Sequence, residues 1–140
     1  MGGPKQAISS GGFTELRYHQ VGETISAGGL SGKIIAYNET FDYHEGLPSM
    51  SNTSNIYFKL ADGGQYVEQM RVYKNRKVVF DFDWGHGHEG FKSGVVHVHQ
   101  WEEDANGIPR RTGIKRYMNN YEMKKYGSII RKANPKVKFR

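Results

Sequence analysis

Residues 56–84, IYFKLADGGQYVEQMRVYKNRKVVFDFDW, contain three runs of β-branched and aromatic residues separated by two short turns. The runs are Ile56–Leu60, Tyr66–Tyr73 and Lys77–Trp84, and a fourth, Val95–Trp101, follows a loop rich in glycine and histidine. Runs of this kind, bounded by turn residues, are typical of strands joined by hairpins. The sequence therefore predicts an antiparallel meander of about four strands.

A helix is expected after these strands, over Arg116–Lys132, with a possible break at Gly127. The apolar positions that suggest helical spacing are Met118, Tyr121, Ile129 and Ile130. Strands followed by a helix predict the α+β class, with the helix packed on the sheet.

The N-terminal part of the chain is less informative. Residues 1–12 contain glycine, serine and proline with little to bury, and we expect a flexible linker or a remnant of expression cloning there. Residues 13–140 are expected to form one domain, since their number is typical of a single core. The apolar run Lys33–Tyr37 is compatible with a strand or a helix, because short apolar runs do not distinguish the two.

The charge balance points to a polyanionic partner. Lysine and arginine total 20 against 14 acids, which gives a formal charge of +6 and a pI near 9.5. Eleven of these cations lie between Gly107 and Arg140, where Glu122 is the single acid. Such a segment suits phosphate binding, although a basic balance can also serve solubility alone.

Several function classes are excluded by composition. The chain has no cysteine, so disulfides, cysteine-ligated zinc and thiol nucleophiles are ruled out. No run approaches the roughly 20 apolar residues that span a bilayer, and Met1–Ser10 lacks the apolar core of a signal peptide.

Period-two alternation assigns side chains to the two faces of the predicted sheet. One face is expected to carry Val78, Phe80, Phe82 and Trp84, and the other Val79, Asp81 and Asp83. In the fourth run, Val96 and Val98 are expected to join the core. His97 and His99 should then point outward, beside the acids.

The unusual chemistry of the chain lies between Asp81 and Trp101, where four of the six histidines fall within 14 residues. These histidines are His86, His88, His97 and His99. Imidazole exchanges protons near neutral pH, and RNA cleavage through the 2′-hydroxyl needs a base, an acid and a cation for the phosphate. Nearby candidates for the cation are Arg71, Lys77 and Lys92.

Two other readings of this cluster remain open. Histidines at exposed strand positions are usually inert. A His-x-His strand can also present two metal ligands on one side, with Asp83 or Glu89 supplying an oxygen.

The basic C-terminal segment also carries tyrosines among its cations, and aromatic rings can stack on bases where cations hold phosphates. The same tyrosines could instead form the buried side of a helix. The candidate RNA-binding residues of the chain are Lys77, Lys92, Arg110, Arg111, Lys115, Arg116, Lys124 and Lys125.

The stretch from Arg71 to Trp84, RVYKNRKVVFDFDW, leads through a His- and Gly-containing loop to VHVHQW and then to Ile-Pro-Arg110. It resembles the C-terminal toxin modules of bacterial polymorphic toxin and contact-dependent inhibition systems. In those modules an arginine-bearing hairpin runs into an Asp-x-Asp strand, and a His-x-His strand with a following aromatic residue comes next. The resemblance covers about residues 66–111.

The resemblance implies a metal-independent ribonuclease without a cofactor, commonly of the barnase/EndoU/colicin/RelE-like fold and often directed at tRNA. It places Arg71, Asp83, His86, His88, His97 and His99 in or beside the active site. It also implies secretion as part of a larger toxin, action in the target-cell cytoplasm, and a cognate immunity protein that covers the basic cleft.

The leading prediction is an endoribonuclease toxin in which His97 and His99 are the acid and base, Arg71 binds the phosphate and Asp83 orients an imidazole. One alternative is a non-catalytic RNA-binding or phage-type structural module, in which the basic segment matters and the histidines do not. The other is a metal-dependent hydrolase with histidine ligands.

Overall fold

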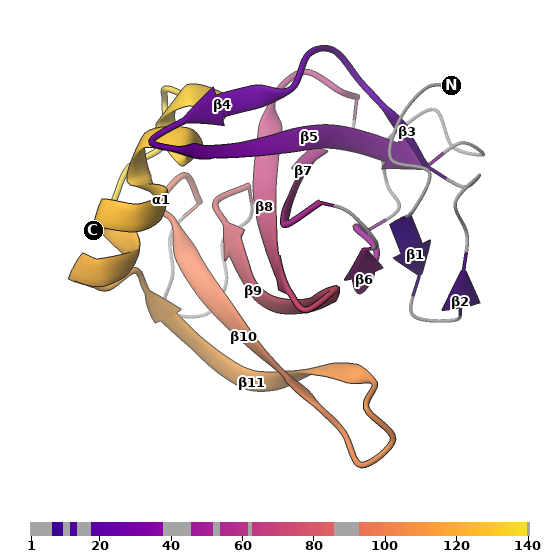
Figure 1. Cartoon of the computed structure of the whole chain (residues 1–140). Coiled ribbons are helices and arrows are strands. Elements are labelled where there is room, and N and C mark those ends of the chain that lie inside the picture. Colours follow the sequence, from indigo (N-terminus) through magenta and orange to yellow (C-terminus); the bar gives the residue numbers. More distant parts are fainter. Residues whose placement is uncertain are drawn as a thin grey trace.

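The structure, a computed structural model, describes residues 7–9, 12–13, 18–37, 46–51, 54–61, 63–85 and 93–139. Within them it contains one mixed, mostly antiparallel sheet and one C-terminal helix (Figure 1). The strands are β1 (Ala7–Ser9), β2 (Gly12–Phe13), β3 (Tyr18–Gln20), β4 (Ile25–Ala27), β5 (Leu30–Tyr37), β6 (Met50–Ser51), β7 (Ile56–Leu60), β8 (Val67–Lys74), β9 (Lys77–Asp83), β10 (His97–Glu103) and β11 (Pro109–Tyr117), and the helix is α1 (Asn120–Ala133). The α+β class is therefore confirmed.

The predicted meander is the centre of the sheet. β7 pairs with β8, β8 with β9 and β9 with β10, and every pairing is antiparallel. The expected number of about four strands was too small, because other strands extend this meander. The undecided run Lys33–Tyr37 belongs to β5, which pairs in parallel with β7. Residues 1–12, expected to be a linker, include β1, which pairs with β6.

The helix begins later than predicted. Arg116 lies in β11, which forms a long hairpin with β10, and α1 starts only at Asn120. The start is set by Asn119, whose side chain accepts from the Glu122 backbone N–H while the Glu122 side chain accepts from that of Asn119. The helix continues through Gly127 without the expected break. An isolated glycine costs only about 1 kcal/mol in a helix, which packing can outweigh.

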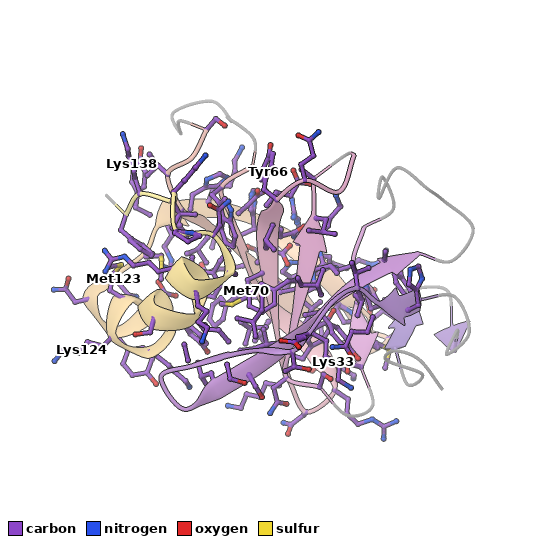
Figure 2. The ribbon with its side chains drawn as sticks, turned by 90° about the horizontal axis from the view of Figure 1, so that it is seen from above. Lys33, Tyr66, Met70, Met123, Lys124 and Lys138 are labelled. Atoms are coloured by element: carbon purple, nitrogen blue, oxygen red, sulfur yellow. The ribbon has the colours of Figure 1, made fainter. Side chains whose placement is uncertain are left out.

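One face of the sheet is apolar and is covered by α1. Met70, Phe82 and Val98 of the sheet are fully buried in one cluster with Ile129 and Ile130 of the helix. Figure 2 shows Met70 between the helix and the strands. Within the described residues, no helix is long and apolar enough to span a membrane.

The other face carries most of the polar side chains of the predicted site, but a β-bulge changes two face assignments. Tyr73 pairs with Val78 and Val72 pairs with Phe80, so Val79 is the additional residue. Val78 consequently packs with Tyr73 in a second cluster, apart from Phe82, whereas Val79 packs against the cluster that contains Phe82. The prediction that Val78 shares a face with Phe80 and Phe82 was therefore wrong, and so was the prediction that Val79 lies on the face of Asp81 and Asp83.

The expectation that the histidines point outward was also wrong. His97 and His99 are on the same face as the acids, but all four of His97, His99, Asp81 and Asp83 are buried. Alternation along a strand identifies a face and cannot show whether other side chains cover it. Here Trp101 and Arg111 reach across to Asp81, and thus cover part of this face.

Candidate active site

Strand register brings the predicted acids and histidines together. Asp83 lies directly opposite His97 across β9 and β10, and Asp81 lies opposite both His99 on β10 and Arg71 on β8. Directly opposite residues of antiparallel strands project from the same face. Three neighbouring strands therefore contribute one continuous polar row.

Asp81 is the centre of a buried network and has no exposed surface. Its Oδ1 accepts from Arg71 Nε at 2.5 Å, and its Oδ2 accepts from Arg71 at 3.0 Å, from Trp101 Nε1 at 3.0 Å and from Arg111 at 2.7 Å. Burial by itself would raise the pKa of Asp81, but the charges and hydrogen bonds of Arg71 and Arg111 lower it overall. The carboxyl group is therefore an anion that accepts four hydrogen bonds from three side chains.

Arg71 is part of the hydrogen-bond network around Asp81 and is itself buried. Its guanidinium also donates to the carbonyl oxygen of Leu47 at 2.7 Å and lies 4.8 Å from the centre of the Trp101 ring. Although burial opposes its charge, the pKa of Arg71 is raised by the neighbouring Asp81. Arg71 is thus largely occupied by internal contacts, whereas the Arg111 side chain is 42% exposed.

Asp83, His97 and His99 form a second buried group beside this network. Each offers a ligand atom, and these atoms lie within 4.8 Å of one another. His99 Nε2 is 3.9 Å from Asp83 Oδ2, and the two imidazole rings meet edge to face at 5.3 Å. His97 Nδ1 is 3.2 Å from the Val95 carbonyl oxygen, which can only accept, so a hydrogen bond there requires the tautomer with its proton on Nδ1.

A cavity of about 230 Å³ opens beside His99. Arg111 and Lys115 line the same cavity. Both project from β11, where a bulge with Gly113 at a positive φ separates the pairs His99–Lys115 and Trp101–Arg111. One imidazole and two cations therefore surround one small space.

The structure does not bring together every predicted site residue. His97 is fully buried and is not among the residues that line this cavity. His86, His88 and Lys92 lie outside the described residues. Asp83 joins the histidines, as the sequence suggested, while Arg71 contacts Asp81.

Within the described residues, the predicted RNA-binding cations lie on three elements, β9, β11 and α1. Four of them pair with acids: Lys77 with Glu103 at 2.6 Å, Arg110 with Asp104 at 3.2 Å, Arg111 with Asp81 at 2.7 Å, and Arg116 with Glu122 at 2.7 Å. Lys124 and Lys125 are exposed on α1, where Lys125 Nζ lies 5.5 Å from the centre of the Tyr126 ring. Figure 2 shows Lys124 at the outer side of the helix.

Sequence reasoning missed that Trp101 and Arg111 are partners of Asp81. Arg111 was assigned to RNA binding only, and it lies 30 residues from Asp81 in the chain. Its position depends on the bulge in the β10–β11 hairpin, for which Gly113 was the one visible signal.

The chain matches no known protein-family model, no curated protein and no solved structure.

Proposed function

We propose that this chain is an endoribonuclease domain in which His99 transfers a proton at the scissile bond while Arg111 and Lys115 hold the phosphate. The observation that carries the proposal is the shared cavity of about 230 Å³, which these three residues line. Imidazole beside two cations suits a reaction that moves protons at a phosphodiester.

The reaction is attack of the ribose 2′-hydroxyl on the adjacent phosphorus. His99 accepts the proton of the 2′-hydroxyl, the P–O2′ bond forms, and the P–O5′ bond breaks as a solvent water protonates the departing 5′-oxygen. The products are a 2′,3′-cyclic phosphate and a free 5′-hydroxyl. The cations stabilise the additional negative charge on the phosphoryl oxygens in the transition state.

The network around Asp81 and the group of Asp83, His97 and His99 position the residues that line this cavity. Asp81 accepts from Arg111 at 2.7 Å and so holds this guanidinium at the cavity. Asp83 Oδ2 lies 3.9 Å from His99 Nε2, close enough to help hold this imidazole in place. We assign His97, packed against His99 at 5.3 Å, to orientation of that ring.

The resemblance to bacterial toxin modules adds a biological role to the proposed activity. On this reading the domain is a toxin that is secreted within a larger protein, cuts RNA such as tRNA in the target-cell cytoplasm, and is neutralised by an immunity protein. The exposed cations Lys124 and Lys125 suit a long polyanion and equally an acidic inhibitor.

The test is incubation of the purified chain with total RNA in excess EDTA, followed by electrophoresis. Wild-type protein should cut RNA, and His99→Ala should not. His19→Ala is the matched control, because His19 is an exposed histidine on β3. Intact RNA after incubation with wild-type protein would reject metal-independent cleavage.

A second candidate function, a metal-dependent hydrolase, is favoured by the group Asp83, His97 and His99. Two imidazoles and a carboxylate within 4.8 Å form a donor set that suits zinc. The contact between His97 Nδ1 and the Val95 carbonyl supports it, because such a bond leaves Nε2 as the nitrogen for a metal. Activity that disappears in EDTA and returns with zinc would select this function over the first.

A further inference from the structure

A second cavity, of about 430 Å³, lies beside the proposed phosphate site and is not used by the proposed reaction. Its lining includes Tyr18, Ser49, Arg71, Trp101 and Arg111. Arg111 lines both cavities, so the two spaces are neighbours. The volume falls within the range of about 300–1,000 Å³ that is usual for small-molecule sites.

We propose that this cavity, called here the Trp101 cavity, binds the base and sugar of the RNA nucleotide next to the scissile phosphate. The proposal rests on the proposed function for the identity of the polymer. It adds a subsite that would give the enzyme a preference for one base.

The aromatic and guanidinium groups in the Trp101 cavity suit a flat ring. The guanidinium carbons of Arg71 and Arg111 lie 4.8 and 5.6 Å from the centre of the Trp101 ring. Unstacked RNA bases bind by stacking on aromatic rings and on arginine planes. The ring is also held in place, since Trp101 Nε1 donates to Asp81 at 3.0 Å.

The charge of the cavity suits one nucleotide. Asp81 balances one of the two guanidinium groups that bind it, Arg71 and Arg111. Arg110, which also lines the cavity, pairs with Asp104 at 3.2 Å. One positive charge therefore remains in excess, enough for the single phosphate of a nucleotide unit.

Ser49 provides an independent indication of a polar ligand. Its side-chain oxygen is buried, and among the described residues it has no hydrogen-bond partner. Its backbone is fixed, because the Ser49 carbonyl accepts from the Val78 N–H at 3.0 Å. A hydroxyl both donates and accepts, so it can read a base edge or bind a ribose hydroxyl, and burying it without a partner is costly.

The first test uses the two tryptophans of the chain and needs no substitution. Nucleoside 5′-monophosphates, and separately inorganic phosphate, are titrated into the full chain while the indole N–H signals are followed by NMR. The Trp101 signal should move with nucleotides and much less with phosphate. Trp84 is the internal control, since its indole is buried and donates to Val67. A Trp101 signal that stays still, or moves equally with phosphate, overturns the proposal.

The second test compares Ser49→Ala with Ser26→Ala by calorimetric titration of the same nucleotides. Ser26 is the matched control, because it is an exposed serine on β4. Loss of one neutral hydrogen bond should weaken nucleotide binding about three- to tenfold and leave phosphate binding unchanged. Nucleotide affinity that is equal in Ser49→Ala and wild type overturns the proposal.

These measurements do not depend on cleavage. Nucleotide binding that involves Trp101 and Ser49, in a chain that leaves RNA intact, would reject the proposed function and retain the subsite. Cleavage that depends on His99, with no nucleotide response at Trp101, would reject only the subsite.

Discussion

Arg71 and Asp81 lie directly opposite each other on β8 and β9, and their side chains meet through two hydrogen bonds of 2.5 and 3.0 Å in the protein interior. Asp81 also binds Trp101 and Arg111, which line the cavities beside it. A single buried carboxylate thus links the stability of the sheet to the arrangement of the candidate site.

Asp81→Asn should destabilise the protein strongly. Removing one charge of a buried ion pair leaves the other uncompensated, at a cost of about 3–5 kcal/mol in the free energy of unfolding. Urea denaturation followed by circular dichroism measures it. Glu103→Gln is the control, because the Lys77–Glu103 pair is exposed and should contribute little. Equal effects of the two substitutions would contradict the central role of Asp81.

The Asp81 carboxylate should also make the stability of the protein depend on pH. The pKa of Asp81 is lowered in the folded protein, so its contribution is fully present above the unfolded-state value of about 4 and is lost as pH falls through the folded value. Thermal unfolding between about pH 6 and pH 2 should show a decline below about pH 4 that is shallower in Asp81→Asn. Parallel curves for the two proteins would argue against the assignment.

His99→Ala should lower the rate of RNA cleavage at least about a hundredfold, the usual effect of removing a general acid or base. Initial rates on a labelled RNA, measured in EDTA, test this, with His19→Ala expected to match wild type. RNA binding by His99→Ala should be nearly normal in a filter-binding assay. A His99→Ala protein that cuts at the wild-type rate would require another catalytic group.

Neutralising Lys124 and Lys125 together should weaken RNA binding and reduce its salt dependence. Each phosphate contact to a single strand contributes about 0.7 to the slope of log affinity against log salt concentration, so the pair should lower that slope by about 1.4. Saturating turnover should be largely kept, because neither residue lines the cavity at His99.

The control for this salt experiment is Lys33→Gln/Lys74→Gln, which changes the net charge equally outside the C-terminal segment. If the two double variants lose affinity alike, only overall charge matters and α1 does not contact RNA.

Ile129→Ala should test the packing of the helix on the sheet. Ile129 is fully buried, and truncating such a residue costs about 2–5 kcal/mol in the free energy of unfolding. Ile114→Ala removes the same atoms from a half-exposed residue and should cost far less. Similar midpoints of urea unfolding for the two variants would mean that α1 does not pack on the sheet as described.

Local patterns in the sequence were enough to identify the central strands. Short turns separate the runs Ile56–Leu60 and Lys77–Trp84 from the run between them. Strands that are joined by such short turns pair with each other in the sheet. The placement of Asp81 and Asp83 on the face shared with His97 and His99 follows from the same periodicity. These features depend on residues close together in the chain.

Features that depend on distant residues were decided by the tertiary structure. The bulge at Val79 places Val78 on the other face of the sheet. The capping box at Asn119 starts the helix after Arg116, which lies in a strand instead. In both places hydrogen bonding to neighbouring elements outweighed local periodicity. The burial of Asp81 depends on Arg111, 30 residues away. The sequence by itself therefore determined the central strands and the shared face of the acids and histidines. Only the folded chain decided where a bulge exchanges the two faces and which residues are covered, since burial is a property of what packs against them.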